Sequence, residues 1–197
     1  MTDKAAVRAR IKSARAALTT AERDQARDAI RTLVLSHCAA TRIPPGSRIA
    51  AYQPLATEPG SAELLANLTE AGYQVIVPLT RPDRDLDWLL WKSPAASEPD
   101  RSADPADRLG LAAIAGAALV LVPAFAVDRH GHRLGRGGGS YDRALSRVPT
   151  STPIAALLYR DELLDAVPND VWDRPVSAVV TPAGWVELTP VGPRNSR

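Results

Sequence analysis

One stretch in the first half of the chain constrains the fold more than any other. An apolar run from Arg48 to Leu55 is followed by a helical pattern, Ala62 to Ala71, and by a second apolar run, Tyr73 to Leu79. Ser61 can cap this helix at its start, and Gly72 can end it. A strand, a helix and a strand within about 30 residues predict a βαβ unit with parallel strands and a right-handed crossover.

The same alternation continues toward the C-terminus. Further strands are expected at Leu86–Trp91, Ala118–Val122, Pro153–Tyr159, Ser177–Thr181 and Trp185–Leu188, with a helix at Tyr141–Arg147. Pro, Ser and Asp are frequent from Ser93 to Asp107, which indicates a surface loop. Alternating strands and helices predict an α/β fold with a largely parallel sheet. The length of 197 residues and the absence of an interdomain linker predict a single domain over residues 1–197.

Two helices are expected before this region, between Asp3 and Cys38. The first has an apolar stripe with helical spacing, made by Val7, Ile11, Ala14 and Leu18. Its basic residues are assigned to another face: Lys4, Arg8, Lys12 and Arg15. Thr19 or Thr20 can cap the second helix, whose inward residues are expected to be Ala26, Ile30, Leu33 and Val34.

Composition excludes several classes of protein. Hydrophobic residues make up 45% and charged residues 23%, as in ordinary globular proteins. No apolar run is long enough for a membrane span, and no signal-peptide core is present, so no membrane partner is expected. Cys38 is the single cysteine, which excludes an internal disulfide and favours a reducing, cytoplasmic location. A net charge of +2 is too small to indicate nucleic-acid binding.

Glycine is distributed unevenly. Five of the 12 glycines fall within nine positions, at 131, 135 and 137–139, between a predicted strand and a predicted helix. Backbone N–H groups can converge in such a loop and bind phosphate, with help from the following helix. Arg133 and Arg136 add guanidinium groups that match phosphate oxygens, and Asp142 is placed to bind Mg²⁺. The segment fits neither a Walker A motif nor the GxGxxG fingerprint, and a flexible loop closing a hairpin remains the alternative.

The segment Arg133-Leu-Gly-Arg-Gly-Gly-Gly-Ser-Tyr-Asp142 resembles the RLGRGxGYYD signature of the 5-formyltetrahydrofolate cyclo-ligase family. Other motifs extend the resemblance over most of the chain: Lys4 with Arg8, Tyr52–Glu58 (YQPLATE), Val122-Pro123 with Asp128, and Trp172-Asp173 followed by Val179–Thr181. The chain departs from the family pattern at Ser140, where a tyrosine is usual, at Leu111–Ile114, and at Arg160-Asp161.

The resemblance implies a three-layer α/β/α domain with a central mixed sheet. It also implies ATP- and Mg²⁺-dependent cyclisation of 5-formyltetrahydrofolate to 5,10-methenyltetrahydrofolate, with ADP and phosphate released. Small molecules would then be the partners, and a monomer is expected. The alternatives are a sugar-phosphate isomerase or CoA-transferase type of enzyme, or a family member with altered folate activity.

Site residues are carried over from the resemblance in four groups. Catalytic roles are implied for Arg136 and Tyr141. The ATP-binding residues would be Lys4, Arg8, Arg133, Leu134, Gly135, Arg136, Gly137, Gly138, Gly139, Ser140 and Tyr141. The folate-binding residues would be Gln53, Leu55, Glu58, Arg136 and Tyr141. Asp142 and Asp173 would bind the metal. His130 and His132 lack an evident third ligand and are interpreted as loop residues or as neighbours of the phosphate.

Overall fold

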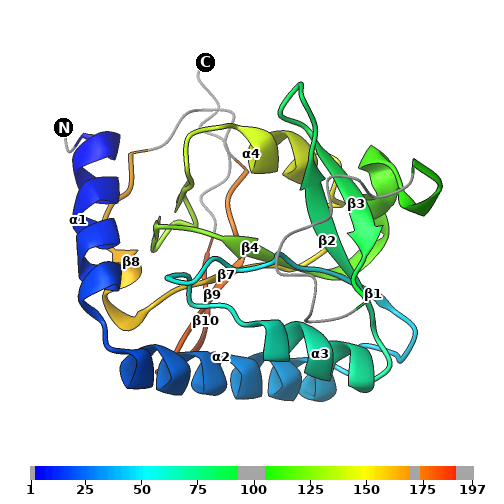
Figure 1. The fold of residues 1–197 in the computed structure, drawn as a ribbon, viewed down its shortest axis with the longest axis horizontal. Helices are drawn as coiled ribbons and strands as arrows, with labels where there is room; N and C mark the ends of the chain where they lie inside the picture. The colour runs from blue at the N-terminus through cyan, green and yellow to red at the C-terminus, as the bar shows by residue number, and fades with distance from the viewer. Residues whose placement is uncertain (1–2, 93–104, 169–173, 190–197) are drawn as a thin grey trace.

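A computed structural model describes residues 3–92, 105–168 and 174–189 (Figure 1). The helices are α1 (Lys4–Ala17), α2 (Thr20–Ala40), α3 (Ala62–Glu70) and α4 (Ser140–Leu145), with short 3₁₀ turns η1 (Pro105–Asp107), η2 (Leu111–Gly116) and η3 (Arg160–Glu162). The strands are β1 (Arg48–Ala50), β2 (Gln74–Thr80), β3 (Leu86–Leu90), β4 (Ala117–Pro123), β5 (Ala126–Asp128), β6 (Arg133–Leu134), β7 (Ile154–Leu157), β8 (Leu163–Leu164), β9 (Ala178–Thr181) and β10 (Gly184–Glu187). No described helix has the length and apolar character needed to cross a membrane.

Seven strands form one sheet in the order β10-β9-β7-β4-β1-β2-β3. The five inner strands pair in parallel, whereas β3 and β10 are antiparallel to their neighbours at the two edges. The parallel pairing of β1 with β2 across α3 confirms the predicted βαβ unit. The expected α/β fold with a mixed, largely parallel sheet is therefore confirmed.

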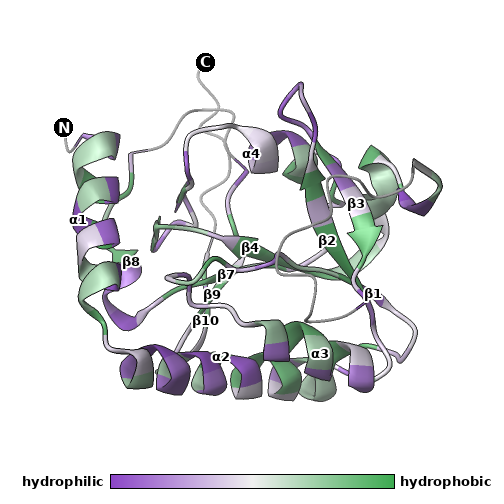
Figure 2. Cartoon of the chain, viewed as in Figure 1, coloured by the Kyte–Doolittle hydropathy of each residue, from purple (hydrophilic) through white to green (hydrophobic). Residues whose placement is uncertain are grey.

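Helices cover both faces of this seven-stranded sheet, giving three layers. One apolar cluster joins α2 and α3 to the sheet, with fully buried members such as Ile30, Leu68 and Leu119. A second cluster joins α4 and η2 to the opposite face, with Ile114, Leu145 and Trp88 in its interior. Figure 2 shows strongly hydrophobic strands in the centre and alternating hydrophobic and hydrophilic turns along α2. Burial of these two clusters supplies the main stabilisation of the fold.

The predicted N-caps explain where α2 and α3 begin. Thr19 caps α2 in a capping box with Glu22, and the Ser61 hydroxyl accepts the Leu64 N–H at the start of α3. Helix α3 ends before Gly72, which has a positive φ of 89°.

Two sequence expectations for this part of the chain are wrong. The strand beginning at Arg48 ends at Ala50 rather than Leu55, because the following residues form the loop that carries Glu58. On α1, Arg15 is buried although it was assigned to a basic face apart from the apolar stripe, whereas Ala14 of the expected apolar stripe is exposed.

A second, three-stranded sheet was not predicted. Its order is β6-β5-β8, with β5 antiparallel to β6 and parallel to β8. It interrupts the expected direct passage from the buried strand β4 into the glycine loop. Helix α1 packs on this sheet through Val7 and Ile11, which join Phe125, Leu134 and Val167 in a small apolar cluster. In Figure 1, α1 lies at one side of the molecule, away from the layer formed by α2 and α3.

Asp128 organises the turn between β5 and β6. Its carboxylate is buried and accepts hydrogen bonds from the backbone of His130, His132 and Val167 and from the His132 ring. Burial alone would raise the pKa of Asp128, but these hydrogen bonds together hold it below its ordinary value. The two histidines therefore belong to a structural turn, as expected from the sequence.

Candidate active site

The glycine loop, residues 135–139, borders a cavity of about 190 Å³ between the two sheets. The wall opposite the loop comes from β2, β3 and the segment after β4, through residues such as Thr80, Leu86 and Phe125. The lining also includes three arginines and two acids, namely Arg15, Arg133, Arg136, Glu58 and Asp142. The structure thus brings together most of the residues that the sequence assigns to phosphate and folate.

The conformation of the loop depends on glycine at particular positions. Gly137 has a φ of 94°, and a Cβ there would lie 3.3 Å from the Arg8 guanidinium. A Cβ at Gly135 would come within 2.6 Å of the Arg133 guanidinium. Both glycines therefore allow an arginine to lie against the loop backbone. Helix α4 has only six residues, so the arginines rather than its dipole supply most of the positive charge.

Arg8 holds the loop from the side of α1. Its Nε donates to the Gly135 carbonyl oxygen at 2.8 Å. Lys4 begins α1 one turn earlier and is half-buried. Leu134, predicted to contact ATP, has its side chain in the small apolar cluster instead of the cavity lining. Its contribution to the loop is that of an apolar anchor at the end of β6.

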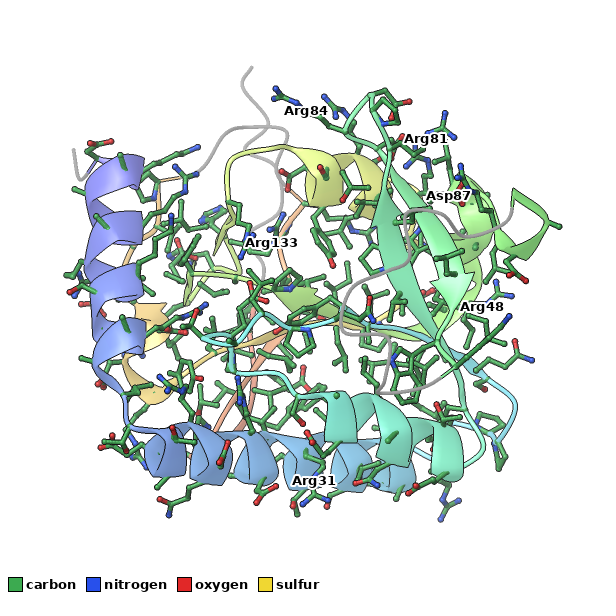
Figure 3. The ribbon with its side chains drawn as sticks, viewed as in Figure 1. Arg31, Arg48, Arg81, Arg84, Asp87 and Arg133 are labelled. Atoms are coloured by element: carbon green, nitrogen blue, oxygen red, sulfur yellow. The ribbon has the colours of Figure 1, made fainter. Side chains whose placement is uncertain are left out.

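Arg133 and Asp142 form the strongest ionic contact beside the loop. Their side chains meet at 2.6 Å, and Arg133 is only 7% exposed. Figure 3 shows Arg133 in the interior between α1 and α4, whereas Arg81 and Arg84 lie near the tip of the β2–β3 hairpin. The Arg133 guanidinium also lies 5.6 Å from the centre of the Tyr141 ring. This pair fixes the positions of both charges at the start of α4.

Two polar atoms at this side of the cavity are buried without a hydrogen-bond partner among the described residues. They are Arg133 Nε and the Tyr141 hydroxyl. Burial raises the pKa of Tyr141, and the positive charge of Arg133 only partly opposes this effect. The phenol therefore remains protonated at neutral pH and is available as a donor. Buried donors without partners are costly, which indicates a site built to bind a ligand with acceptor oxygens.

Glu58 approaches the loop from the other side of the cavity. It is 8% exposed, accepts the Leu55 N–H at 2.9 Å, and its Oε1 lies 3.4 Å from an Arg136 nitrogen. Tyr159 and Arg27 donate to the Glu58 backbone carbonyl and hold its loop against the core. A carboxylate is thereby fixed opposite the phosphate-type loop, with Arg136 between them.

The other two residues expected to bind folate lie elsewhere. Gln53 and Leu55 line a neighbouring hollow of about 290 Å³ at the start of α3, together with Trp91. Leu55 still contributes to the main cavity indirectly, because its N–H orients the Glu58 carboxylate. Their assignment to the folate site remains a prediction.

Of the two aspartates that the sequence assigns to the metal, the structure describes Asp142. Asp173 lies outside the described residues, and Asp142 is paired with Arg133. Over residues 3–92, 105–168 and 174–189 there is no group of three histidine, cysteine or acidic side chains that could hold a metal ion. Magnesium commonly uses only one or two carboxylates together with substrate phosphates and water. Asp142 beside a phosphate-type loop fits that pattern.

Sequence reasoning did not identify Arg15 as part of the site. Its position about two turns after Arg8, on the same helix face, was the available signal. Tyr52 is not in the cavity lining, but its hydroxyl is buried without a hydrogen-bond partner in the described part of the chain. Burial and the nearby Glu58 raise the pKa of Tyr52 well above its ordinary value.

Known proteins with this fold and sequence identify the chain's family. The solved 5,10-methenyltetrahydrofolate synthetase of Mycoplasma pneumoniae superposes with a TM-score of 0.73 at 21% identity, covering 92% of this chain and 99% of that one. The Aquifex aeolicus 5,10-methenyltetrahydrofolate synthetase gives 0.73 at 23% identity, covering 98% and 94%. These two structures are similar in fold.

Sequence comparison is more specific. The chain is 38% identical over 144 residues to the 5-formyltetrahydrofolate cyclo-ligase of Mycolicibacterium smegmatis. The matching region covers 70% of this chain and 74% of that protein. The model of the 5-formyltetrahydrofolate cyclo-ligase family matches residues 1–182. The protein is an α/β enzyme of the ligase class. More narrowly, the chain belongs to the 5-formyltetrahydrofolate cyclo-ligase family.

Proposed function

We propose that the protein cyclises 5-formyltetrahydrofolate to 5,10-methenyltetrahydrofolate and consumes ATP in the presence of Mg²⁺. The observation that carries this proposal is that the glycine loop and Glu58 line the same cavity, where Arg136 of the loop lies 3.4 Å from the Glu58 carboxylate. Such a cavity can hold a phosphate chain and an amino-pyrimidine ring at once, which is the arrangement that phosphoryl transfer to a folate requires.

The reaction needs ATP because a formamide carbon is a poor electrophile. In the proposed sequence, the formyl oxygen of the substrate attacks the γ-phosphorus of ATP, and ADP leaves. The neighbouring folate amine then attacks the activated carbon and closes the ring. Inorganic phosphate departs with the former formyl oxygen, and the amine proton is lost. Phosphoryl transfer of this kind depends mainly on positioning and on neutralisation of charge.

The residues of the phosphate side provide that neutralisation. Backbone N–H groups of the glycine loop, which lines the cavity, would donate to phosphate oxygens. Arg133 Nε, which has no hydrogen-bond partner among the described residues, would donate to them as well. Arg136, which is largely exposed beside Glu58, can turn from that carboxylate to the transferred phosphoryl group. The protonated Tyr141 hydroxyl can donate to the formyl oxygen or to the phosphate that replaces it.

Glu58 would orient the folate. A carboxylate accepts two N–H donors side by side, and the amino-pyrimidine edge of a folate presents such donors. Fixing that ring determines where the formyl group lies relative to the loop. Asp142 would hold Mg²⁺ with the substrate phosphates, and the bound ion would supply positive charge for the phosphate oxygens.

The near-ultraviolet absorbance of the methenyl product provides the test. The protein should generate that absorbance from 5-formyltetrahydrofolate only when ATP and Mg²⁺ are both present, and EDTA should stop it. Equimolar ADP and phosphate should accompany the product. Absence of any absorbance change with all three components present would refute the proposed reaction. Turnover of the folate without ATP would instead refute the phosphorylation step.

A further inference from the structure

Arg15, which lines the cavity, forms a buried ion pair with Glu162. Arg15 comes from the last turn of α1 and Glu162 from η3, 147 residues later in the chain. The two side chains make two hydrogen bonds, of 2.6 and 2.8 Å, and are only 3% and 5% exposed as residues. Two-point contacts of this kind fix both the distance and the orientation of the partners.

The Arg15 side of the pair reaches the segment that leads to the glycine loop. Its second nitrogen donates to the Ala124 carbonyl at 2.7 Å, directly after β4. The guanidinium also lies 5.3 Å from the centre of the Phe125 ring. On the same helix, Arg8 donates to the Gly135 carbonyl. Helix α1 therefore holds the segment 124–135 near both ends, with the small sheet strands β5 and β6 between them.

The Glu162 side of the pair reaches the loop that carries Glu58. Glu162 accepts the Tyr159 N–H at 2.8 Å, and the Tyr159 ring lies 5.6 Å from the Arg15 guanidinium. The Tyr159 hydroxyl in turn donates to the Glu58 carbonyl at 3.3 Å. A continuous set of contacts thus joins the two walls of the cavity through one buried pair.

We propose that Arg15 and Glu162 are positioning residues that fix the distance and orientation between the glycine loop and the Glu58 loop across the cavity. The pair sets the relative position of the two substrates without supplying a reacting group. A misplacement of the reacting atoms by about 1 Å can lower turnover by two orders of magnitude. This inference rests on the proposed function for its kinetic consequence, but its structural consequence can be measured separately.

The decisive variant removes both charges together. Loss of one partner alone would leave a buried unpaired charge and threaten folding, whereas replacement of both by neutral residues is often tolerated. In Arg15→Met/Glu162→Gln, the glutamine can still accept the Tyr159 N–H. We expect the thermal midpoint of this double variant to fall by less than about 8 °C. Arg10→Met, at an exposed position of α1, is the matched control and should match the wild type in every measurement.

Kinetics and binding distinguish positioning from direct contact. The double variant should lose about 10- to 100-fold in kcat, while the Kd for ATP–Mg²⁺ by calorimetry changes by less than about threefold. Arg15→Lys keeps the charge but not the two-point geometry, so it should also lose kcat. Wild-type kcat in the double variant or in Arg15→Lys would overturn the proposal. A loss of more than about tenfold in ATP affinity would overturn it as well, because Arg15 would then bind phosphate directly.

Hydrogen exchange of the ligand-free protein provides a readout that does not depend on the reaction. Amides in segments 53–59 and 124–139 should both exchange faster in the double variant and stay unchanged in Arg10→Met. Unchanged exchange in either segment would overturn the positioning role. If the wild type proved inactive toward 5-formyltetrahydrofolate, the proposed function would fail, and the exchange result would still decide this inference.

Discussion

The two sheets of this protein are held in place by different forces. The seven-stranded sheet is covered on both faces by large apolar clusters, and most residues of its inner strands are buried. The three-stranded sheet has strands of two or three residues and a small apolar cluster, and arginines of α1 hold its flanking segments. The first sheet is therefore a stable framework, whereas the second depends on polar contacts and leads into the glycine loop that we propose to bind phosphate.

The candidate active site lies where the two regions meet. Glu58 is on a loop that follows β1 of the large sheet, and the glycine loop follows β6 of the small one. Substitutions in the framework should chiefly change stability, and substitutions beside the small sheet should chiefly change turnover. The substitutions below run from the largest expected effect to the smallest.

Asp142→Ala should cause the largest loss. It removes the partner of Arg133 and the carboxylate proposed to hold Mg²⁺, so we expect kcat to fall by at least about 1,000-fold while the fold is retained. Turnover is measured by methenyl absorbance and folding by circular dichroism. Asp165→Ala, at a completely exposed side chain, is the control and should be fully active. Near-normal activity of Asp142→Ala would contradict the metal role.

Truncation of a buried leucine should have different effects on kcat in the two regions. Leu119→Ala in the framework and Leu134→Ala beside the glycine loop both create cavities, since each side chain is almost completely buried. Leu119→Ala should cost about 2–5 kcal/mol of unfolding free energy but leave kcat of the folded protein unchanged. Leu134→Ala should lower kcat as well, because Leu134 anchors the loop. Urea unfolding and kinetics on the same samples check this, and equal effects on kcat would contradict the division.

Glu58→Gln should affect one substrate more than the other. We expect KM for the folate to rise by about 10- to 100-fold, with a much smaller change for ATP, because a carboxylate that binds ring N–H donors is replaced by a neutral amide. Lys4→Ala should do the reverse and raise KM for ATP more than KM for the folate. Glu70→Gln, at an exposed position at the end of α3, is the neutral control. Equal changes for both substrates in Glu58→Gln would contradict its assignment to the folate.

The framework was predictable because local patterns and burial agree there. Ile30 and Val34 on α2 recur at helical spacing and are fully buried, and Ser61 caps the helix that the sequence assigns to it. The glycine loop and Glu58 could be assigned to one site because their motifs are local and specific.

The small sheet and the buried pair were not predictable in the same way. Strands as short as Arg133–Leu134 are too brief for an alternation of side chains to appear. An arginine on a helix normally indicates a solvent-exposed face, and Arg15 is buried only because its partner Glu162 arrives from a distant part of the chain. The position of Gln53 and Leu55 in a neighbouring hollow was not predictable for a similar reason, since Arg27 and Tyr159 hold the Glu58 loop through contacts between distant parts of the chain.

The smallest effect concerns a charged pair that connects the framework to the end of α4. Asp85, just before β3, receives two hydrogen bonds from Arg147, of 2.9 and 2.5 Å. The Arg147 guanidinium holds the pKa of Asp85 below its ordinary value. A carboxyl with a lowered pKa in the folded state stabilises the protein above its unfolded pKa of about 3.9, and this contribution disappears as pH falls through the lowered value.

Asp85→Asn should therefore reduce the unfolding free energy by less than about 1 kcal/mol at pH 7, and the difference from wild type should vanish toward pH 2. Urea unfolding between pH 7 and pH 2 measures it, with Asp83→Asn at a half-exposed side chain as the control. Stability curves that stay parallel down to pH 2 would show that the Asp85 charge contributes nothing. Arg147 follows the C-terminal end of α4, whereas the cavity is lined by residues at the start of that helix. We therefore expect kcat of Asp85→Asn to stay at the wild-type value. That result would assign the Asp85–Arg147 pair to the framework rather than to the polar contacts that position the glycine loop.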